Sequence, residues 1–162
     1  MGIDSFWYKA VLVVHILTAI VGLGGVTLNA LYAAESRKRE GAASLAVLDA
    51  NFRVTLVAEK AIYVVLLAGL GLVWLSDGAW SFGGTWIWLS IVLFVVALGA
   101  SHGVLIPSHR ATVRELRQAG EQGRAPDGAR LGALGKRQAI VGPVLHLLLV
   151  VIVVLMVWKP GS

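Results

Sequence analysis

The sequence contains no cysteine, and this absence excludes disulfide bonds, metal sites built from thiolates and catalysis by a cysteine nucleophile. Only two methionines are present, Met1 and Met156, so a pathway for Cu(I), which prefers thioether or thiolate ligands, has few candidate ligands. Walker, Rossmann and zincin motifs are also missing. The sequence therefore gives no support to the common nucleotide-binding and metalloprotease classes.

Charged residues are scarce, at 14% of the 162 residues, while 57% of the residues are hydrophobic and the mean hydropathy is +0.80. A soluble domain of this size cannot bury so much apolar surface, whereas a lipid bilayer can. The net charge is +5. The basic residues flank apolar runs, and this distribution argues against a nucleic-acid partner. We therefore expect an integral membrane protein whose first partner is the lipid bilayer.

Four apolar runs each approach or exceed the ~20 residues that cross a hydrocarbon core of ~30 Å. Each run must be helical, because lipid offers no hydrogen-bond partner to an open backbone. The sequence thus predicts an all-α fold, a single domain formed by an up-down bundle of four transmembrane helices. The predicted spans are about 8–34, 54–76, 85–106 and 138–158, with long connections at 35–53 and 107–137.

The basic residues and the tryptophans predict how the bundle lies in the membrane. The 77–84 connection contains no Lys or Arg, whereas the 35–53 connection contains four and the 107–137 connection seven. Basic connections favour the cytoplasmic side, so both termini are expected outside. All six tryptophans lie at the other ends of the spans, where indole rings favour the headgroup level: Trp7, Trp74, Trp80, Trp86, Trp88 and Trp158.

The two long connections contain weaker local signals. The 45–52 stretch is expected to form a short interfacial helix, and Thr112 and Glu115 have the spacing of a capping box. Glycines and a proline between positions 120 and 135 predict a flexible segment. The basic residues serve as topology determinants, and they also suit anionic lipids.

Small and polar residues form a stripe about 100° wide along the first span. Thr18, Gly22 and Gly25 lie on this stripe together with His15 and Asn29. The stripe is expected to face the bundle, because glycines let a neighbouring helix or a flat cofactor approach the backbone. Two interpretations stay open: a packing face on which His15 is hydrogen-bonded to a neighbour, and a ligand-binding face.

Ionisable residues inside a membrane span are functional candidates, because lipid makes them costly. Glu59, Lys60 and His102, with the neutral Asn29, form a candidate polar network. Glu59 and Lys60 also fit an interfacial position in which the Lys60 ammonium reaches the headgroups. A metal site built from His102, His109 and Glu59 can be imagined, but Pro107 is expected to break the helix between the two histidines, and no metal site is predicted.

Two histidines on facing helices are the strongest cofactor signal. His15 lies eight residues from Trp7, or roughly 12 Å, and His146 lies twelve residues from Trp158, or roughly 18 Å. The fourth helix of an up-down bundle neighbours the first and the third, so His146 could pair with His15 or with His102. We therefore predict His15 and His146 as the axial ligands of haem b, whose potential such ligands help to set. Buried histidines of this kind also serve as proton relays or as hydrogen-bonding residues.

The start of the first span resembles a known group of bacterial membrane proteins. Trp7, Tyr8, Lys9 and Ala10, followed by His15 and the 22–25 glycine stretch, resemble the opening helix of the copper-resistance protein D and HemJ-like superfamily. The chain looks most like an uncharacterised four-span bacterial family in that group. This resemblance implies a compact helix bundle in a bacterial inner membrane.

The same resemblance implies chemistry. HemJ-type proteins are haem-associated protoporphyrinogen oxidases that use a histidine in their first span and a downstream lysine. His15 matches the first position, and Lys60, near the membrane edge of the second span, is the candidate for the second. The copper-resistance relatives imply metal traffic instead.

Three classes of function follow from these signals. The first is redox or electron-transfer chemistry supported by haem within the bilayer. The second is a small transporter or channel subunit in which Asn29, His146 and His102 line a polar path. The third is a non-catalytic assembly or scaffold protein that uses the Gly22 and Gly25 face and the basic connections to form a homo-oligomer or to bind a membrane partner protein.

Overall fold

The computed structural model describes residues 2–161, and these residues form helices and short connections without any strand. The all-α fold predicted from the sequence is confirmed. The elements are α1 (Phe6–Ser36), α2 (Gly41–Leu75), α3 (Thr85–Ala100), the π-helix η1 (Ser101–Leu105), α4 (Ile106–Glu121) and α5 (Gly128–Trp158). Because α3, η1 and α4 follow one another without a break, the described residues form four long helices, each apolar enough to cross a membrane.

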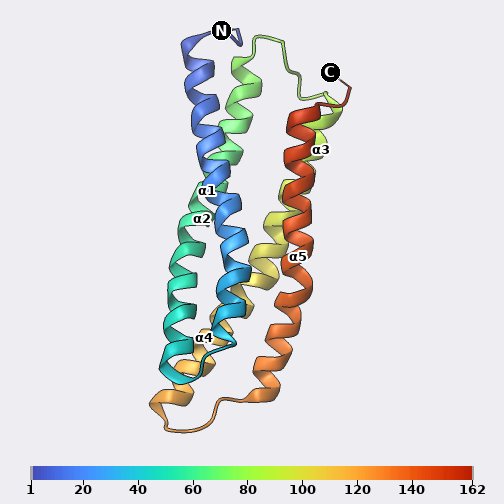
Figure 1. Ribbon diagram of the computed structural model, residues 1–162. Coiled ribbons are helices and arrows are strands. Elements are labelled where there is room, and N and C mark those ends of the chain that lie inside the picture. Colours follow the sequence, from blue (N-terminus) through green and yellow to red (C-terminus); the bar gives the residue numbers. More distant parts are fainter. Residues whose placement is uncertain (1, 162) are drawn as a thin grey trace.

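The helices run up and down and associate as two pairs (Figure 1). Helix α1 packs along α2, and α5 packs along α3, η1 and α4, whereas α1 and α5 touch only briefly. Both termini lie at one end of the bundle, which we call the tryptophan end. The opposite end carries α4 and the connections that contain the basic residues, and we call it the basic end (Figure 1).

The contact between α1 and α2 depends on the small residues of α1. Gly22 and Gly25 are buried and face α2. A Cβ atom added to Gly22 would lie 2.9 Å from Cγ1 of Ile62, and one added to Gly25 would overlap the Cβ of Ala58. Thr18 is half-buried, and its hydroxyl donates to the Val14 carbonyl of its own helix at 2.7 Å. Glycine thus allows the two backbones to approach more closely than any larger residue would.

The third long helix passes through Pro107 without ending. Proline lacks a backbone donor and normally breaks a helix. Immediately before it, the N–H of Ile106 donates to the carbonyl of Ser101, a π-type register that inserts one extra residue into the helix. Because the π-turn shifts the hydrogen-bond register next to the proline, the chain continues directly into α4. The prediction that Pro107 breaks this helix is therefore wrong.

At the basic end the first turns of α2 pack against α4. The Phe52 ring stacks on the His109 ring with centroids 5.7 Å apart, and Nη2 of Arg117 lies 3.2 Å from both carboxylate oxygens of Asp49. Leu48 is buried one turn before Phe52. The short interfacial helix expected at 45–52 is thus part of α2, which begins at Gly41.

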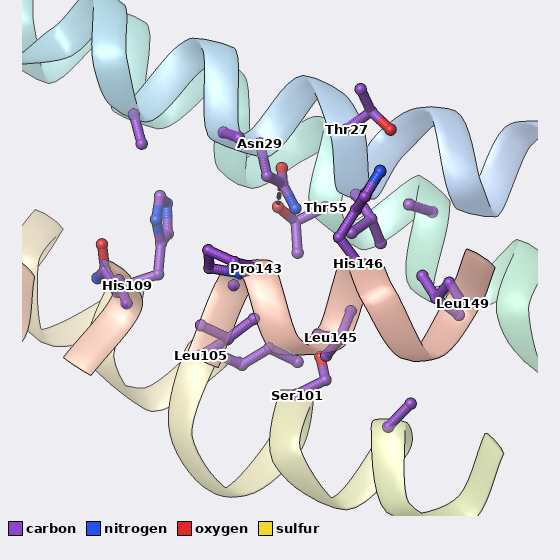
Figure 2. Close-up of a pocket in the computed structure, with 18 of the residues that line it drawn as sticks. Thr27, Asn29, Thr55, Ser101, Leu105, His109, Pro143, Leu145, His146 and Leu149 are labelled. Atoms are coloured by element: carbon purple, nitrogen blue, oxygen red, sulfur yellow. Dashed lines mark hydrogen bonds between the residues drawn. The ribbon is translucent and has the colours of Figure 1, made fainter. Parts of the chain in front are cut away.

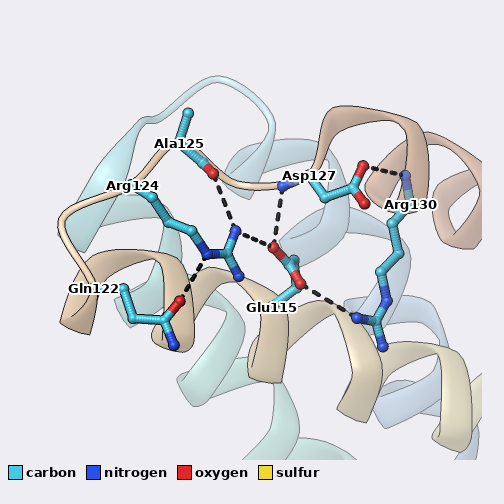
Figure 3. Close-up of polar contacts among 6 residues, drawn as sticks. All are labelled: Glu115, Gln122, Arg124, Ala125, Asp127 and Arg130. Carbon is cyan, nitrogen blue, oxygen red and sulfur yellow. Dashed lines mark hydrogen bonds and ion pairs between the residues drawn. The ribbon is translucent and has the colours of Figure 1, made fainter.

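Glu115 fixes the connection between α4 and α5 (Figure 3). Its side chain is only 3% exposed. Oε1 accepts from Nη1 of Arg124 at 2.8 Å and from the backbone N–H of Asp127 at 3.1 Å, and Oε2 lies 3.4 Å from Nη1 of Arg130. The hydrogen bond from Arg124, followed by that from Asp127, holds the pKa of Glu115 below its ordinary value. Helix α4 is polar and lies beyond the apolar spans, so this cluster is extramembrane.

Two local predictions for this connection are wrong. Thr112 lies inside α4 and donates to the Ser108 carbonyl at 3.0 Å, so Thr112 and Glu115 do not form a capping box. Asp127 is the residue that caps a helix here, because its Oδ1 accepts from the N–H of Arg130 at 3.0 Å. The expected flexible segment also ends early, since α5 begins at Gly128.

The six tryptophans at the tryptophan end lie in two kinds of environment. Trp7, Trp74, Trp88 and Trp158 are exposed on the outside of the bundle, as expected at the headgroup level. The other two point inward: the Trp80 and Trp86 rings meet edge-on at 5.6 Å, and Nε1 of Trp80 donates to the Tyr8 hydroxyl at 3.0 Å. Nζ of Lys159 lies 4.0 Å from the Trp80 ring centroid. These contacts join α1, α3 and the end of α5.

Candidate functional site

A cavity of about 660 Å³ lies between the two helix pairs. Its wall is formed by positions 26–37 of α1, 51–62 of α2, 94–109 of the α3–α4 helix and 138–150 of α5. These segments extend from the middle of the bundle toward the basic end. The volume falls within the roughly 300–1,000 Å³ of typical small-molecule sites.

Most of the cavity wall is apolar. Phe94, Leu145 and Leu149 are buried side chains of this wall, and Val26 and Ile62 add to it from α1 and α2. Gly142 leaves open space, because a Cβ atom added there would meet no atom within 4 Å. Such a wall suits a hydrocarbon or an aromatic body.

Two buried polar atoms of the wall have no hydrogen-bond partner among residues 2–161. Asn51 is only 3% exposed, and its Oδ1 is one of these atoms. The other is Nε2 of His109, whose ring stacks on Phe52. An unpaired buried polar group costs about 1–3 kcal/mol, and native structures usually give such groups a partner. Both residues line the cavity, but these two atoms have almost no accessible surface, so they do not face it.

Asn29 also lies on the cavity wall, as Figure 2 shows. Its Oδ1 accepts from the Thr55 hydroxyl at 3.0 Å, and this hydrogen bond joins α1 to α2. Asn29 of the α1 stripe is thus hydrogen-bonded across the contact between α1 and α2, beside the cavity.

The two predicted haem ligands lie in different surroundings. His146 lines the cavity, and its ring extends from α5 toward α1 (Figure 2). His15 lies between α1 and α2 instead, where Nδ1 is 2.9 Å from the Val65 carbonyl oxygen. Its ring packs against Gly69, so closely that an added Cβ on Gly69 would lie 3.1 Å from Cε1 of His15. His15 is not part of the cavity wall, so the structure does not bring the two histidines together there.

His102 lies in the π-helix and forms a polar cluster with Glu59 and Tyr63. Its Nε2 is 2.9 Å from Oε1 of Glu59 and 2.8 Å from the Tyr63 hydroxyl, and its Nδ1 is 3.0 Å from the Leu98 carbonyl oxygen. Glu59 and His102 both line the cavity. Lys60 is exposed. Within the predicted polar network, Glu59 and His102 are therefore joined directly, while Asn29 is bonded elsewhere.

Comparison with known protein families places this arrangement in a defined group. The sequence model of the family described as "Predicted integral membrane protein (DUF2269)" matches residues 9–160. The chain belongs to this family. The match covers α1 from Lys9 onward, the other three long helices and every residue of the cavity wall. It confirms the predicted resemblance to an uncharacterised family of integral membrane proteins. No curated protein and no solved structure matches the chain.

The described part of this DUF2269 chain contains no group of three or more His, Cys, Asp or Glu side chains positioned to hold a metal ion. His109 stacks on Phe52 at the basic end, apart from the contact between His102 and Glu59. The metal site imagined from these three residues is not assembled.

Two residues of the DUF2269 cavity region were not predicted as candidates. Asn51 lies in the predicted 35–53 connection, although its spacing to Thr55 and Ala58 by three or four residues follows one helical face. The partner of Tyr63, His102, lies 39 residues away, so no local pattern indicates their contact. The helical spacing could have revealed Asn51, whereas the contact of Tyr63 follows only from the packing of α2 against the π-helix.

Proposed function

We propose that the protein binds a small, largely apolar molecule within the membrane, in the cavity between its two helix pairs. One observation carries this proposal: an apolar cavity of about 660 Å³ is lined toward the basic end by the polar residues Arg37, Asn51 and Gln138. An amphipathic molecule matches this arrangement, with its body against the apolar wall and its polar head toward the basic end. Lipid tails are as apolar as the wall, so the polar contacts decide which molecule binds.

Filling the cavity tests the proposal. The variant Gly142→Leu places a side chain in open space on the cavity wall. Gly99→Leu is the matched control, because Gly99 also has open space around it and lies on an exposed face outside the cavity. Purified protein is titrated with a fluorescent probe that carries a dodecyl chain. We expect binding to the wild type and to the control, with at least tenfold weaker binding to Gly142→Leu. Equal binding by both variants would contradict the proposal.

Haem b is a more specific candidate for the occupant, and it remains a prediction. His146 supplies one imidazole on the cavity wall, but His15 is hydrogen-bonded to α2, so this histidine pair does not fit two axial positions of one haem. The link to the copper-resistance protein D and HemJ-like superfamily, which also suggested haem, is likewise a prediction. A Soret band that disappears in His146→Ala would support haem binding. A colourless protein after expression with ample haem would contradict it.

Transport is a second candidate function, because the Glu59 and His102 contact lies on the cavity wall. A carboxylate and an imidazole in contact within a membrane are typical of proton routes. Proton flux into liposomes that contain the protein, reduced in Glu59→Gln, is the result that this function requires. The scaffold alternative keeps the basic connections as a contact surface for a partner, but not the Gly22 and Gly25 face, because α2 covers it.

We also propose that the protein lies in a bacterial inner membrane with both termini outside. The eleven Lys and Arg residues of the 35–53 and 107–137 segments, against none in 77–84, support this orientation through the positive-inside rule. The exposed tryptophans at the opposite end agree with it.

A further inference from the structure

If the cavity binds an amphipathic molecule as proposed above, the charge at its basic end selects the head of that molecule. We infer, building on that proposed function, that the head is an anion, a carboxylate or a phosphate, and that it binds the guanidinium of Arg37.

Arg37 directly follows α1, lines the cavity and has an exposed side chain. Its Nε donates to the Ala33 carbonyl at 3.0 Å, and this hydrogen bond fixes one edge of the guanidinium. Nη1 and Nη2 have no hydrogen-bond partner within residues 2–161. These two nitrogens present parallel N–H groups, which match the oxygens of a carboxylate or a phosphate.

The carboxylate that is nearest to Arg37 in the sequence pairs with other cations. Oε2 of Glu35 lies 3.1 Å from Nζ of Lys38, and Oε1 lies 2.8 Å from Nη1 of Arg39. Within residues 2–161, Arg37 therefore lines the cavity as a cation without a carboxylate partner. An anionic head would supply that partner.

The other polar groups of the wall agree with an anion at this end. Nε2 of Gln138 makes one long hydrogen bond, 3.5 Å to the Thr112 hydroxyl, so its second hydrogen can be donated to a ligand. Glu59 is the only acidic residue of the wall among the described residues, and it contacts His102 at 2.9 Å. It lies eight residues beyond Asn51 along α2, or ~12 Å deeper in the bundle, so its charge is remote from the basic end.

The apolar wall gives the chain of such a molecule a path away from its head. Along α1 the wall extends from Arg37 back to Val26, eleven residues or ~16 Å of helix rise. A hydrocarbon chain can follow this wall toward the middle of the bundle while the head stays at Arg37. A cationic head would lie beside the guanidinium and be repelled by it, and a neutral head would gain no charge attraction.

Three probes with the same twelve-carbon chain distinguish the heads: dodecanoate, 1-dodecanol and dodecylamine. At about pH 8 they are anionic, neutral and cationic. Each competes with the fluorescent dodecyl probe for detergent-purified wild-type protein, and protein-free micelles give the correction for partition into detergent. We expect dodecanoate to displace the probe at concentrations at least tenfold lower than the other two, because a guanidinium binds a carboxylate more strongly than a neutral group. Equal or better displacement by the alcohol or the amine overturns the anionic assignment, while the proposed binding function stands.

Two variants then locate the head. Arg37→Gln removes the charge and keeps a polar side chain, so it should weaken dodecanoate at least tenfold and leave 1-dodecanol nearly unchanged. Lys38→Gln is the matched control, because Lys38 is the next residue, has the same charge and does not line the cavity. Unchanged dodecanoate binding in Arg37→Gln, or equal weakening in both variants, overturns the assignment to Arg37. If Arg37→Gln does not fold, the comparison of the three probes on the wild type decides alone.

Dodecyl phosphate and inorganic phosphate distinguish an amphipathic anion from a free one. Dodecyl phosphate should displace the fluorescent probe as dodecanoate does, whereas inorganic phosphate at the same concentration should not. Displacement by inorganic phosphate would indicate a site for a free anion and would overturn the amphipathic assignment. If no dodecyl probe binds the wild type, the proposed function itself fails.

Discussion

Nε2 of His102 lies 2.9 Å from Oε1 of Glu59, although the two residues are 43 positions apart in the sequence. The other ring nitrogen of His102 lies 3.0 Å from the Leu98 carbonyl oxygen. A carbonyl only accepts, so this nitrogen, Nδ1, carries a proton. Nε2 also lies 2.8 Å from the Tyr63 hydroxyl, which can donate to it. One imidazole of the π-helix η1 therefore contacts two polar side chains of α2.

Nitrogen-15 NMR of histidine-labelled protein tests this contact. We expect Glu59→Gln to shift the Nε2 signal of His102 more than its Nδ1 signal, because Nε2 is the nitrogen that contacts Glu59, whereas Nδ1 contacts the Leu98 carbonyl. The signals of His146, which lies on α5, serve as the control. An Nε2 signal that does not change in Glu59→Gln would contradict the contact.

The close approach of α1 and α2 should make Gly22 intolerant of larger residues. In Gly22→Leu the new side chain meets Ile62, and overpacking of this kind costs roughly 1–3 kcal/mol. Thermal unfolding in detergent measures the effect. Gly24→Leu is the control on the same helix, because a Cβ atom added at Gly24 meets nothing within 4 Å. Equal unfolding temperatures for the two variants would show that the glycine contact does not hold the pair together.

Glu115 should make the extramembrane connection sensitive to acid. Its pKa is lowered in the folded state from the ordinary value of 4.5, first by the hydrogen bond from Arg124. A lowered folded-state pKa means that the carboxylate stabilises the fold above about pH 4.5, and that this contribution is lost as the pH falls through the folded-state pKa.

We therefore expect Glu115→Gln to lower the unfolding temperature at neutral pH, and the difference from the wild type to shrink in acid. Glu121→Gln is the control, because Glu121 is exposed on the same helix. A difference that stays constant from neutral to acidic pH would argue against an ionised Glu115 as the source of the stability.

The orientation of the bundle is tested with topology reporters. A reporter fused after Ser162, or inserted between positions 82 and 83, should report the external side, while one inserted after Gly123 should report the cytoplasm. The physical reason is the concentration of basic residues at the end that contains Gly123. A cytoplasmic signal from the fusion at Ser162 would reverse the proposed orientation.

The fold could be predicted from the sequence because each span is identified by its own residues. Apolar runs long enough to cross a bilayer predict four helices, and the stripe that contains Gly22 and Gly25 shows which face of α1 is made for close contact. The stripe does not identify the helix that it contacts. In the structure this helix is α2, and His15 consequently hydrogen-bonds with the Val65 carbonyl rather than approaching His146.

The site was harder to predict because it depends on distances between helices. The contact between Glu59 and His102 joins two spans, and His102 lies in the π-helix before Pro107, which a reading of the sequence as regular α-helix does not include. The sequence does not indicate Asn51 for a different reason. This residue lies in a segment too polar to be recognised as part of a long helix, although α2 continues through it.

The central claim is that the cavity holds a small amphipathic molecule, and native mass spectrometry of protein released gently from its own membrane tests it most directly. The wild type and Gly99→Leu should each show a population heavier than the chain by the mass of one small molecule, and the heavier population should be absent from Gly142→Leu. If the wild type carries no such molecule, or if Gly142→Leu carries the same one in the same amount, the account is contradicted.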